Sequence, residues 1–169
     1  PTHAHFSQEG NTRILTLDPV TIEFNGLTVK LQTKEYFEEG SSKIKIERNI
    51  LEMSDPDAEV TIDEYMVACY GTTEYPEDMT SVVLKCEGAD EKTIHYAYKC
   101  RSEVLAGATA VSAVVPPIDT KVSLTASSTD AEGYIEEGYA FSPMFKLGYK
   151  KTITDKEVFT TWLNLEKAN

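Results

Sequence analysis

Two histidines near the start of the chain are the residues whose spacing points most directly to metal chemistry. The chain begins Pro1-Thr2-His3-Ala4-His5. An amino terminus followed by histidine at position three can chelate Cu(II) or Ni(II) in a square-planar set of nitrogens, to which His5 could contribute. The alternative is a solvated arm that holds no metal. His3 and His5 are therefore candidate copper ligands.

Acidic residues in a short polar stretch suggest calcium chemistry. Asp55, Asp57 and Glu59 alternate along the chain, as the first oxygen ligands of a calcium-binding loop do. The match to an EF-hand loop then stops, because Val60 stands where glycine is required and Met66 where a bidentate glutamate is required. A solvated Asp-Pro turn accounts for the same residues. The three acidic residues are candidate metal ligands, with a polar turn as the alternative.

Tyrosines are the third group that could contact a ligand. A tyrosine joins a large apolar ring to a hydroxyl that needs a hydrogen-bond partner, so it suits ligand cavities and protein interfaces. It is also a common strand residue. A single tryptophan in the chain does not indicate a carbohydrate-binding platform. The candidate ligand or interface residues are Tyr96, Tyr98, Tyr134 and Tyr139.

Sequence motifs of the common enzyme classes are absent from the chain. It contains no Gly-x-Ser-x-Gly, no glycine-rich phosphate loop, no His-Glu-x-x-His and no Cys-x-x-Cys. A cysteine–histidine pair could be assembled only around His95, with Cys86 or Cys69 as the nucleophile. We therefore predict no enzymatic activity and no cofactor.

Charge and composition limit the partners of the chain. A formal net charge of −12 over 169 residues would repel a nucleic-acid backbone and an anionic membrane surface. No apolar run reaches the roughly 18 residues that a membrane-spanning helix needs. The absence of an initiator methionine favours a secreted chain from which a leader has been removed. Cys69, Cys86 and Cys100 allow at most one disulfide within the chain, with the pairing left open.

The elements that would position these residues are mainly strands, and the clearest is a hairpin at Asn25-Gly26. Both residues tolerate the positive φ that a type I′ turn requires. Counting outward from the turn pairs Ile22 with Val29. Side chains alternate across a strand, so we expect one face to pack inward together, and an Asp at position 22 to destabilise the fold strongly. That face carries Val20, Ile22, Phe24, Leu27, Val29 and Leu31.

Three other segments complete the expected organisation. Residues 1–13 are polar and aperiodic, which predicts a flexible N-terminal arm. The small apolar run 102–115 is compatible with a helix, but its β-branched residues and Gly107 favour a strand. Thr154 and Glu157 form a capping-box pattern ahead of apolar residues spaced by three and four, which predicts a helix over about 155–167.

Together these segments predict an all-β chain with one domain over 14–169. The expected architecture is an antiparallel β-sandwich, or a closed β-barrel, of about ten short strands with one C-terminal α-helix. We predict a structural or interaction protein that pairs with copies of itself or with a protein partner through strand edges and the N-terminal arm. The alternatives are a β-barrel carrier of a small apolar ligand and an acidic extracellular metal-binding protein.

Overall fold

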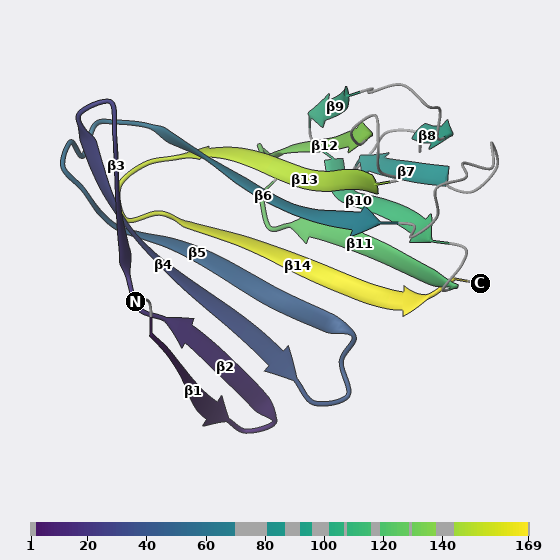
Figure 1. The fold of residues 1–169 in the computed structure, drawn as a ribbon, viewed down its shortest axis with the longest axis horizontal. Coiled ribbons are helices and arrows are strands. Elements are labelled where there is room, and N and C mark those ends of the chain that lie inside the picture. Colours follow the sequence, from purple (N-terminus) through teal and green to yellow (C-terminus); the bar gives the residue numbers. More distant parts are fainter. Residues whose placement is uncertain are drawn as a thin grey trace.

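The computed structural model describes residues 3–69, 81–86, 92–95, 102–106, 108–115, 119–128, 130–137 and 144–168. Within these ranges the chain forms β-strands and turns and no helix. The strands form one 10-stranded and one 4-stranded sheet, which pack face to face (Figure 1). The predicted antiparallel all-β sandwich is therefore confirmed. No helix in the described part is long and apolar enough to cross a membrane.

The larger sheet contains both ends of the described chain. In order across the sheet, its strands are β1 (Ala4–Glu9), β2 (Thr12–Leu17), β4 (Leu27–Glu38), β5 (Lys43–Met53), β14 (Val158–Lys167), β11 (Thr120–Ala126), β10 (Ala108–Val115), β7 (Ser81–Cys86) and β8 (Lys92–His95), with β3 (Val20–Phe24) paired to β4. The last of these strands in chain order, β14, thus lies in the middle of the sheet, between β5 and β11.

The smaller sheet consists of β6 (Val60–Cys69), β13 (Met144–Ile153), β12 (Glu132–Glu137) and β9 (Ser102–Ala106), in this order. Beneath it lies the main core, where Phe159 of β14 and Leu124 of β11 meet Leu147 of β13 and Ile135 of β12. A second cluster joins Val29, Ile50, Met53 and Ile153 at the other end of β13. The core sits where the two sheets overlap.

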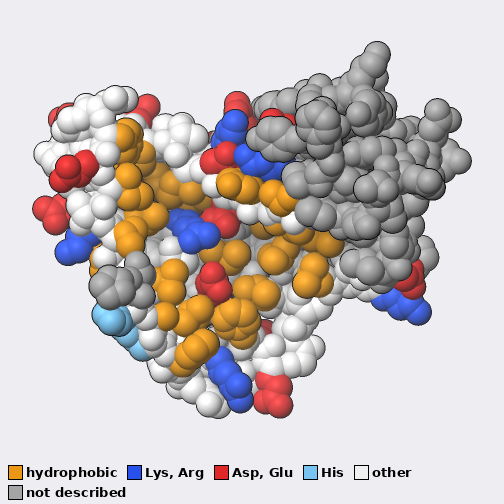
Figure 2. Space-filling model, viewed as in Figure 1, with side chains coloured by type: hydrophobic (Ala, Val, Ile, Leu, Met, Phe, Trp, Pro, Cys, Tyr) orange, Lys and Arg blue, Asp and Glu red, His pale blue; other side chains and the backbone are white. Residues whose placement is uncertain are grey.

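The larger sheet extends beyond the smaller one on the side of β1, β2, β4 and β5 (Figure 1). Five apolar residues there, and Leu165 on the adjoining β14, lie on the same side of the sheet as the core, because the strand register aligns them with inward-facing positions. All six are half-buried or exposed. Figure 2 shows hydrophobic side chains gathered over this part of the sheet. We call them the open apolar face: Phe6, Leu15, Phe37, Ile44, Ile46 and Leu165.

The Asn25-Gly26 hairpin forms with the predicted register. Asn25 has a φ of 49° and Gly26 a φ of 79°, and Ile22 pairs with Val29. The predicted inward face is only partly packed, since Val29 is 4% exposed whereas Ile22 is 45% exposed. The side of the hairpin that bears the apolar residues was predicted correctly, but β3 lies at the outer edge of β4, where little covers it.

The predicted C-terminal helix over about 155–167 is wrong. Val158–Lys167 forms β14, which pairs along its length with β5 and β11. The capping contact does form, because the Thr154 amide donates to a Glu157 carboxylate oxygen at 2.6 Å. It closes a turn instead of starting a helix, since Lys156 has a left-handed φ of 60°. Pairing with two neighbouring strands outweighs a helical spacing of the apolar residues.

The flexible arm predicted over 1–13 is replaced by structure from residue 4 onward. Ala4–Glu9 forms β1, and a turn containing Gly10 at a φ of 60° leads into β2. β1 is exposed along its whole length, so its polar composition reflects an edge strand. The strand conformation predicted for 102–115 is confirmed over a helix, but the stretch forms two strands, β9 in the smaller sheet and β10 in the larger one.

Candidate functional site

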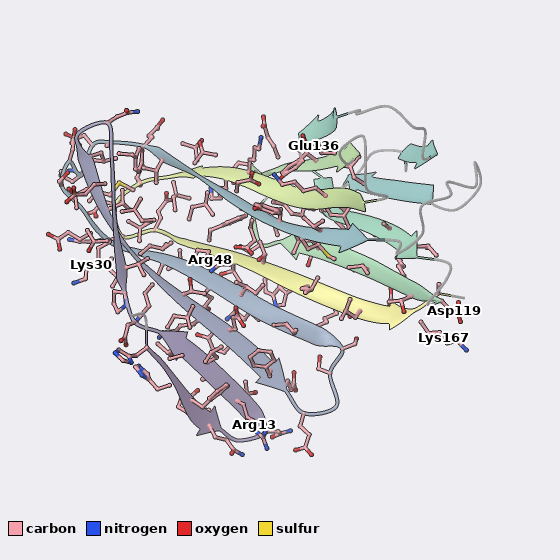
Figure 3. All side chains as sticks on the ribbon, viewed as in Figure 1. Arg13, Lys30, Arg48, Asp119, Glu136 and Lys167 are labelled. Atoms are coloured by element: carbon pink, nitrogen blue, oxygen red, sulfur yellow. The ribbon has the colours of Figure 1, made fainter. Side chains whose placement is uncertain are left out.

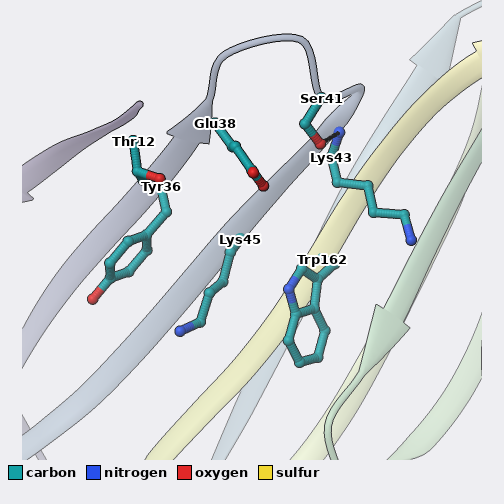
Figure 4. Close-up of a pocket in the computed structure, with 7 residues that line it drawn as sticks. All are labelled: Thr12, Tyr36, Glu38, Ser41, Lys43, Lys45 and Trp162. Carbon is teal, nitrogen blue, oxygen red and sulfur yellow. Dashed lines mark hydrogen bonds between the residues drawn. The ribbon is translucent and has the colours of Figure 1, made fainter. Parts of the chain in front are cut away.

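A pocket of about 290 Å³ lies on the face of the larger sheet that points away from the smaller sheet. The strand register builds it, because Tyr36 of β4 pairs with Lys45 of β5, and Lys45 pairs with Trp162 of β14. These three side chains therefore form one row, with Lys45 between the two rings (Figure 4). The full lining is Thr12, Tyr36, Glu38, Ser41, Lys43, Lys45 and Trp162.

Glu47, two residues after Lys45 and on the same face of β5, holds one wall of the pocket in place. Its carboxylate accepts a hydrogen bond from the Tyr36 hydroxyl at 2.6 Å and forms an ion pair with the Lys45 ammonium at 2.7 Å. The same ammonium lies 4.6 Å from the centroid of the Tyr36 ring, within the range of a cation–π contact. The contacts hold Tyr36 and Lys45 in fixed positions, so this wall is preorganised.

The charges in this wall shift two pKa values. Burial, and then the hydrogen bond to the Glu47 carboxylate, raise the pKa of Tyr36 to about 12. Burial acts to raise the pKa of Glu47, but hydrogen bonds from Lys45 and Tyr36 outweigh it and lower that pKa below its ordinary value. At neutral pH the phenol is therefore a donor and the carboxylate an acceptor.

The opposite wall carries polar groups that are available to a ligand. Among the described residues, the side chains of Glu38, Lys43 and Trp162 have no hydrogen-bond or ion-pair partner. They supply a carboxylate acceptor, an ammonium donor and an indole N–H donor beside the flat face of the indole ring. An aromatic platform with donors and acceptors at its rim suits a compact, hydroxyl-rich ligand.

The candidate metal ligands lie far from this pocket in the fold. His3 and His5 are exposed at the N-terminal edge of the larger sheet, and the His5 ring lies 3.9 Å from Asp18. Asp55, Asp57 and Glu59 lie in the exposed turn before β6. The described residues contain no group of three or more metal-ligating side chains. Copper and calcium binding thus stay predictions from the sequence.

In the Asp55 turn, the carboxylate of Asp55 accepts a hydrogen bond from the Asp57 amide at 3.0 Å. The Ala58 amide bonds to the Asp55 carbonyl oxygen. These contacts are those of a polar turn, which was the alternative interpretation of the acidic residues.

Of the four candidate tyrosines, Tyr134 is described, and it is buried. Its hydroxyl donates to Asp63 at 2.5 Å, and burial followed by this hydrogen bond raises its pKa. The ring packs on Gly148 of β13, where an added Cβ would lie 2.5 Å from it. Tyr134 thus joins β12 to β13 and β6. The side chains of Tyr96, Tyr98 and Tyr139, and of the three cysteines, lie outside the described residues.

The sequence analysis missed the residues that line the pocket. Alternation in Lys43-Ile44-Lys45-Ile46-Glu47 does place both lysines on one face. Trp162, however, was assigned to a helix, so nothing brought it to β5. Only an assignment of 158–165 as a strand, with alternating faces, would have indicated that Trp162 could join Tyr36 and Lys45 in one row.

Comparison with known proteins finds related folds and no related sequence. No family model and no curated protein matches the chain. A galactose mutarotase-like protein from Clostridium acetobutylicum shares the fold with a TM-score of 0.56, 10% identity and 99% of this chain aligned. A candidate aldose 1-epimerase from Escherichia coli K12 has a TM-score of 0.58, 10% identity and 98% aligned. A TPR-domain containing protein from Parabacteroides distasonis has a TM-score of 0.64, 9% identity and 98% aligned.

The chain spans only part of each of these proteins. It covers 66% of the mutarotase-like chain, 68% of the epimerase chain and 34% of the TPR-domain chain. At such identities the likeness establishes the fold alone.

The prediction that the chain is no enzyme is contradicted by the fold comparison. The chain shares its fold with a galactose mutarotase-like protein and a candidate aldose 1-epimerase, so this fold does not exclude enzymatic activity. The absence of common catalytic motifs therefore excludes no activity, because function depends on the site and not on the motif.

Proposed function

We propose that the chain binds a sugar in the pocket between Tyr36 and Trp162. The observation that carries the proposal is the half-buried indole of Trp162, flanked by the Glu38 carboxylate and the Lys43 ammonium, neither of which has a partner among the described residues. A sugar ring presents an apolar face that can lie on an aromatic ring, and a rim of hydroxyls that both donate and accept hydrogen bonds. The sequence did not indicate a sugar site. Trp162 becomes part of a binding platform only because strand pairing places it beside Lys45 of β5 and in line with Tyr36 of β4.

The names of two structures with this fold support a sugar ligand. One is named a galactose mutarotase-like protein and the other a candidate aldose 1-epimerase, so monosaccharides are the first ligands to test. The pocket volume, about 290 Å³, is at the lower end of the usual range for small-molecule sites and suits one or two sugar rings.

The experiment follows the fluorescence of the protein while D-galactose, D-glucose or lactose is added. Trp162 is the only tryptophan in the chain, so any change in tryptophan emission reports this pocket directly. We expect a saturable change, and calorimetry should give the same dissociation constant. Polarimetry on the same samples tests whether the protein accelerates interconversion of the sugar anomers.

Two substitutions test the polar rim, each with a matched control. Lys43→Gln and Glu38→Gln should each weaken binding by about tenfold, since each removes a charged hydrogen-bond partner. Lys30→Gln and Glu52→Gln make the same chemical changes on the cross-strand pair Lys30–Glu52, outside the pocket, and should bind as the unmodified protein does. Binding that survives both rim substitutions would contradict the proposal.

A further inference from the structure

The edge of β6 is long, straight and open in the described structure. β6 is the end strand of the smaller sheet and pairs only with β13, through ten consecutive residues without a register shift. Its described side chains from Val60 to Val67 include no lysine or proline. Edge strands are normally protected by such residues or by bulges, because unpaired N–H and C=O groups template the addition of another strand.

The open apolar face lies on the side of the larger sheet that faces β6. Arg48 of β5, labelled in Figure 3, reaches across the two layers: it binds Glu64 of β6 at 2.5 Å and Thr33 of β4 at 2.7 Å. Val60 and Ile62 of β6 pack on the core beside this ion pair. Beyond this ion pair, the open apolar face extends outward from the sheet–sheet interface over β5, β4 and β2.

One carboxylate lies among the residues of the open apolar face. Glu35 of β4 pairs with Leu15 on one side and Ile46 on the other, so it points to the same side as the open apolar face. The hydrogen bond to Glu64 raises the pKa of Arg48, and attraction to the Glu35 carboxylate helps to raise it, but among the described residues no hydrogen bond or ion pair reaches the Glu35 side chain. A basic side chain on a segment that covers the open apolar face would form an ion pair with the Glu35 carboxylate.

We propose that an extended segment of a partner protein docks here as an additional strand. It pairs with the free edge of β6 and lays alternate apolar side chains, with one Lys or Arg opposite Glu35, on the open apolar face. A lipid would supply no backbone donors for the β6 edge. Antiparallel pairing of β6 with β6 of a second copy would bring the two larger sheets into one layer, where their β1–β5 regions would collide.

The test uses synthetic peptides of about nine residues in which isoleucine alternates with threonine, with one central isoleucine replaced by arginine in half of them. Binding to the full chain is followed by fluorescence anisotropy of labelled peptide. Hydrogen exchange locates it, since docking must protect amides of β6. We expect the arginine peptide to bind more tightly, and Glu35→Gln to remove that difference.

Paired substitutions distinguish the two faces of the sheet. Leu15→Glu places a charge on the open apolar face and should weaken binding by at least about tenfold, whereas Thr16→Glu, the next residue on the opposite face, should not. Circular dichroism melts establish that both variants fold. If Leu15→Glu fails to fold, Glu35→Lys, which places a like charge opposite the peptide arginine, serves in its place.

Four outcomes would overturn the proposal. They are the absence of peptide binding, binding without protection of β6, a concentration-dependent dimer in light scattering that Leu15→Glu abolishes, and binding to phosphatidylcholine vesicles that Leu15→Glu abolishes. The last two outcomes would mean that the open apolar face binds a second copy of the chain or a lipid surface. None of these outcomes bears on the sugar pocket, which lies on the other face.

Discussion

Phe159 and Leu165 lie on the same strand and point to the same side of the larger sheet, yet Phe159 is 1% exposed and Leu165 is 46% exposed. The smaller sheet makes the difference, because it covers the first residue and not the second. Alternation along a strand therefore determines the face of a side chain, and the reach of the opposing layer determines whether that face is buried.

The largest expected effect comes from one cross-strand pair of the hairpin. Val29→Asp buries an unpaired carboxylate and should lower the free energy of unfolding by about 4 to 5 kcal/mol. Ile22→Asp, directly opposite, should cost less than about 1 kcal/mol because Ile22 is largely solvated. Urea denaturation of both variants measures this. If the two substitutions lowered the free energy of unfolding equally, the Ile22 side chain would have to be buried in solution, which would contradict its exposed position on β3.

Truncation within β14 should give a smaller difference of the same kind. Phe159→Ala leaves a cavity between the sheets and should cost about 3 to 4 kcal/mol. Leu165→Ala removes a half-solvated side chain and should cost about 1 kcal/mol or less. Thermal unfolding of the two variants compares them, and a larger loss for Leu165→Ala would show that the open apolar face is covered in solution.

The Arg48–Glu64 pair marks the border between the two regions, and it should have an intermediate effect. Arg48→Met leaves the buried Glu64 carboxylate without its partner and should cost about 2 to 3 kcal/mol, below the value for a fully buried pair since the guanidinium is partly solvated. Replacing both residues by methionine should restore most of the loss. Chemical denaturation of the single and double variants tests this, and a double variant no more stable than Arg48→Met contradicts it.

The smallest expected effect is the pH dependence of the polar face. The pKa of Tyr36 is raised from 10.0 to about 12, so the folded chain retains a proton that the unfolded chain has lost between these values. Stability from Tyr36 is thus complete below pH 10 and is lost as the pH rises toward 12. Tyr36→Phe should flatten that decline in melting curves recorded across this range. An unchanged decline would place the lost stability elsewhere.

Much of the fold could be predicted because its signals are local. The Asn25-Gly26 turn determines its own register, and the alternation at residues 43–47 determines the two faces of β5. The C-terminal strand could not be predicted in this way. Its apolar residues fit a helical spacing, and only the presence of β5 and β11 on both sides makes the extended form more stable.

The candidate site could not be predicted for a related reason. Tyr36 and Lys45 lie near each other in the sequence, but Trp162 reaches them only through the pairing of β14 with β5. The sequence-based candidates were selected for residue type. Tyr134 shows the weakness of that choice, since its hydroxyl is occupied by Asp63 and its ring by Gly148.

The central place of β14 also has a consequence for biosynthesis. As the chain leaves the ribosome, β1–β5 and β10–β11 are made before the strand that joins them. Until β14 emerges, β5 and β11 both present unpaired edges, and Phe159 is missing from the core. The sandwich thus cannot close before β14 has been made. Such a nascent chain depends on slow, long-range pairing and is exposed to aggregation, so it is a natural client for chaperones until β14 inserts.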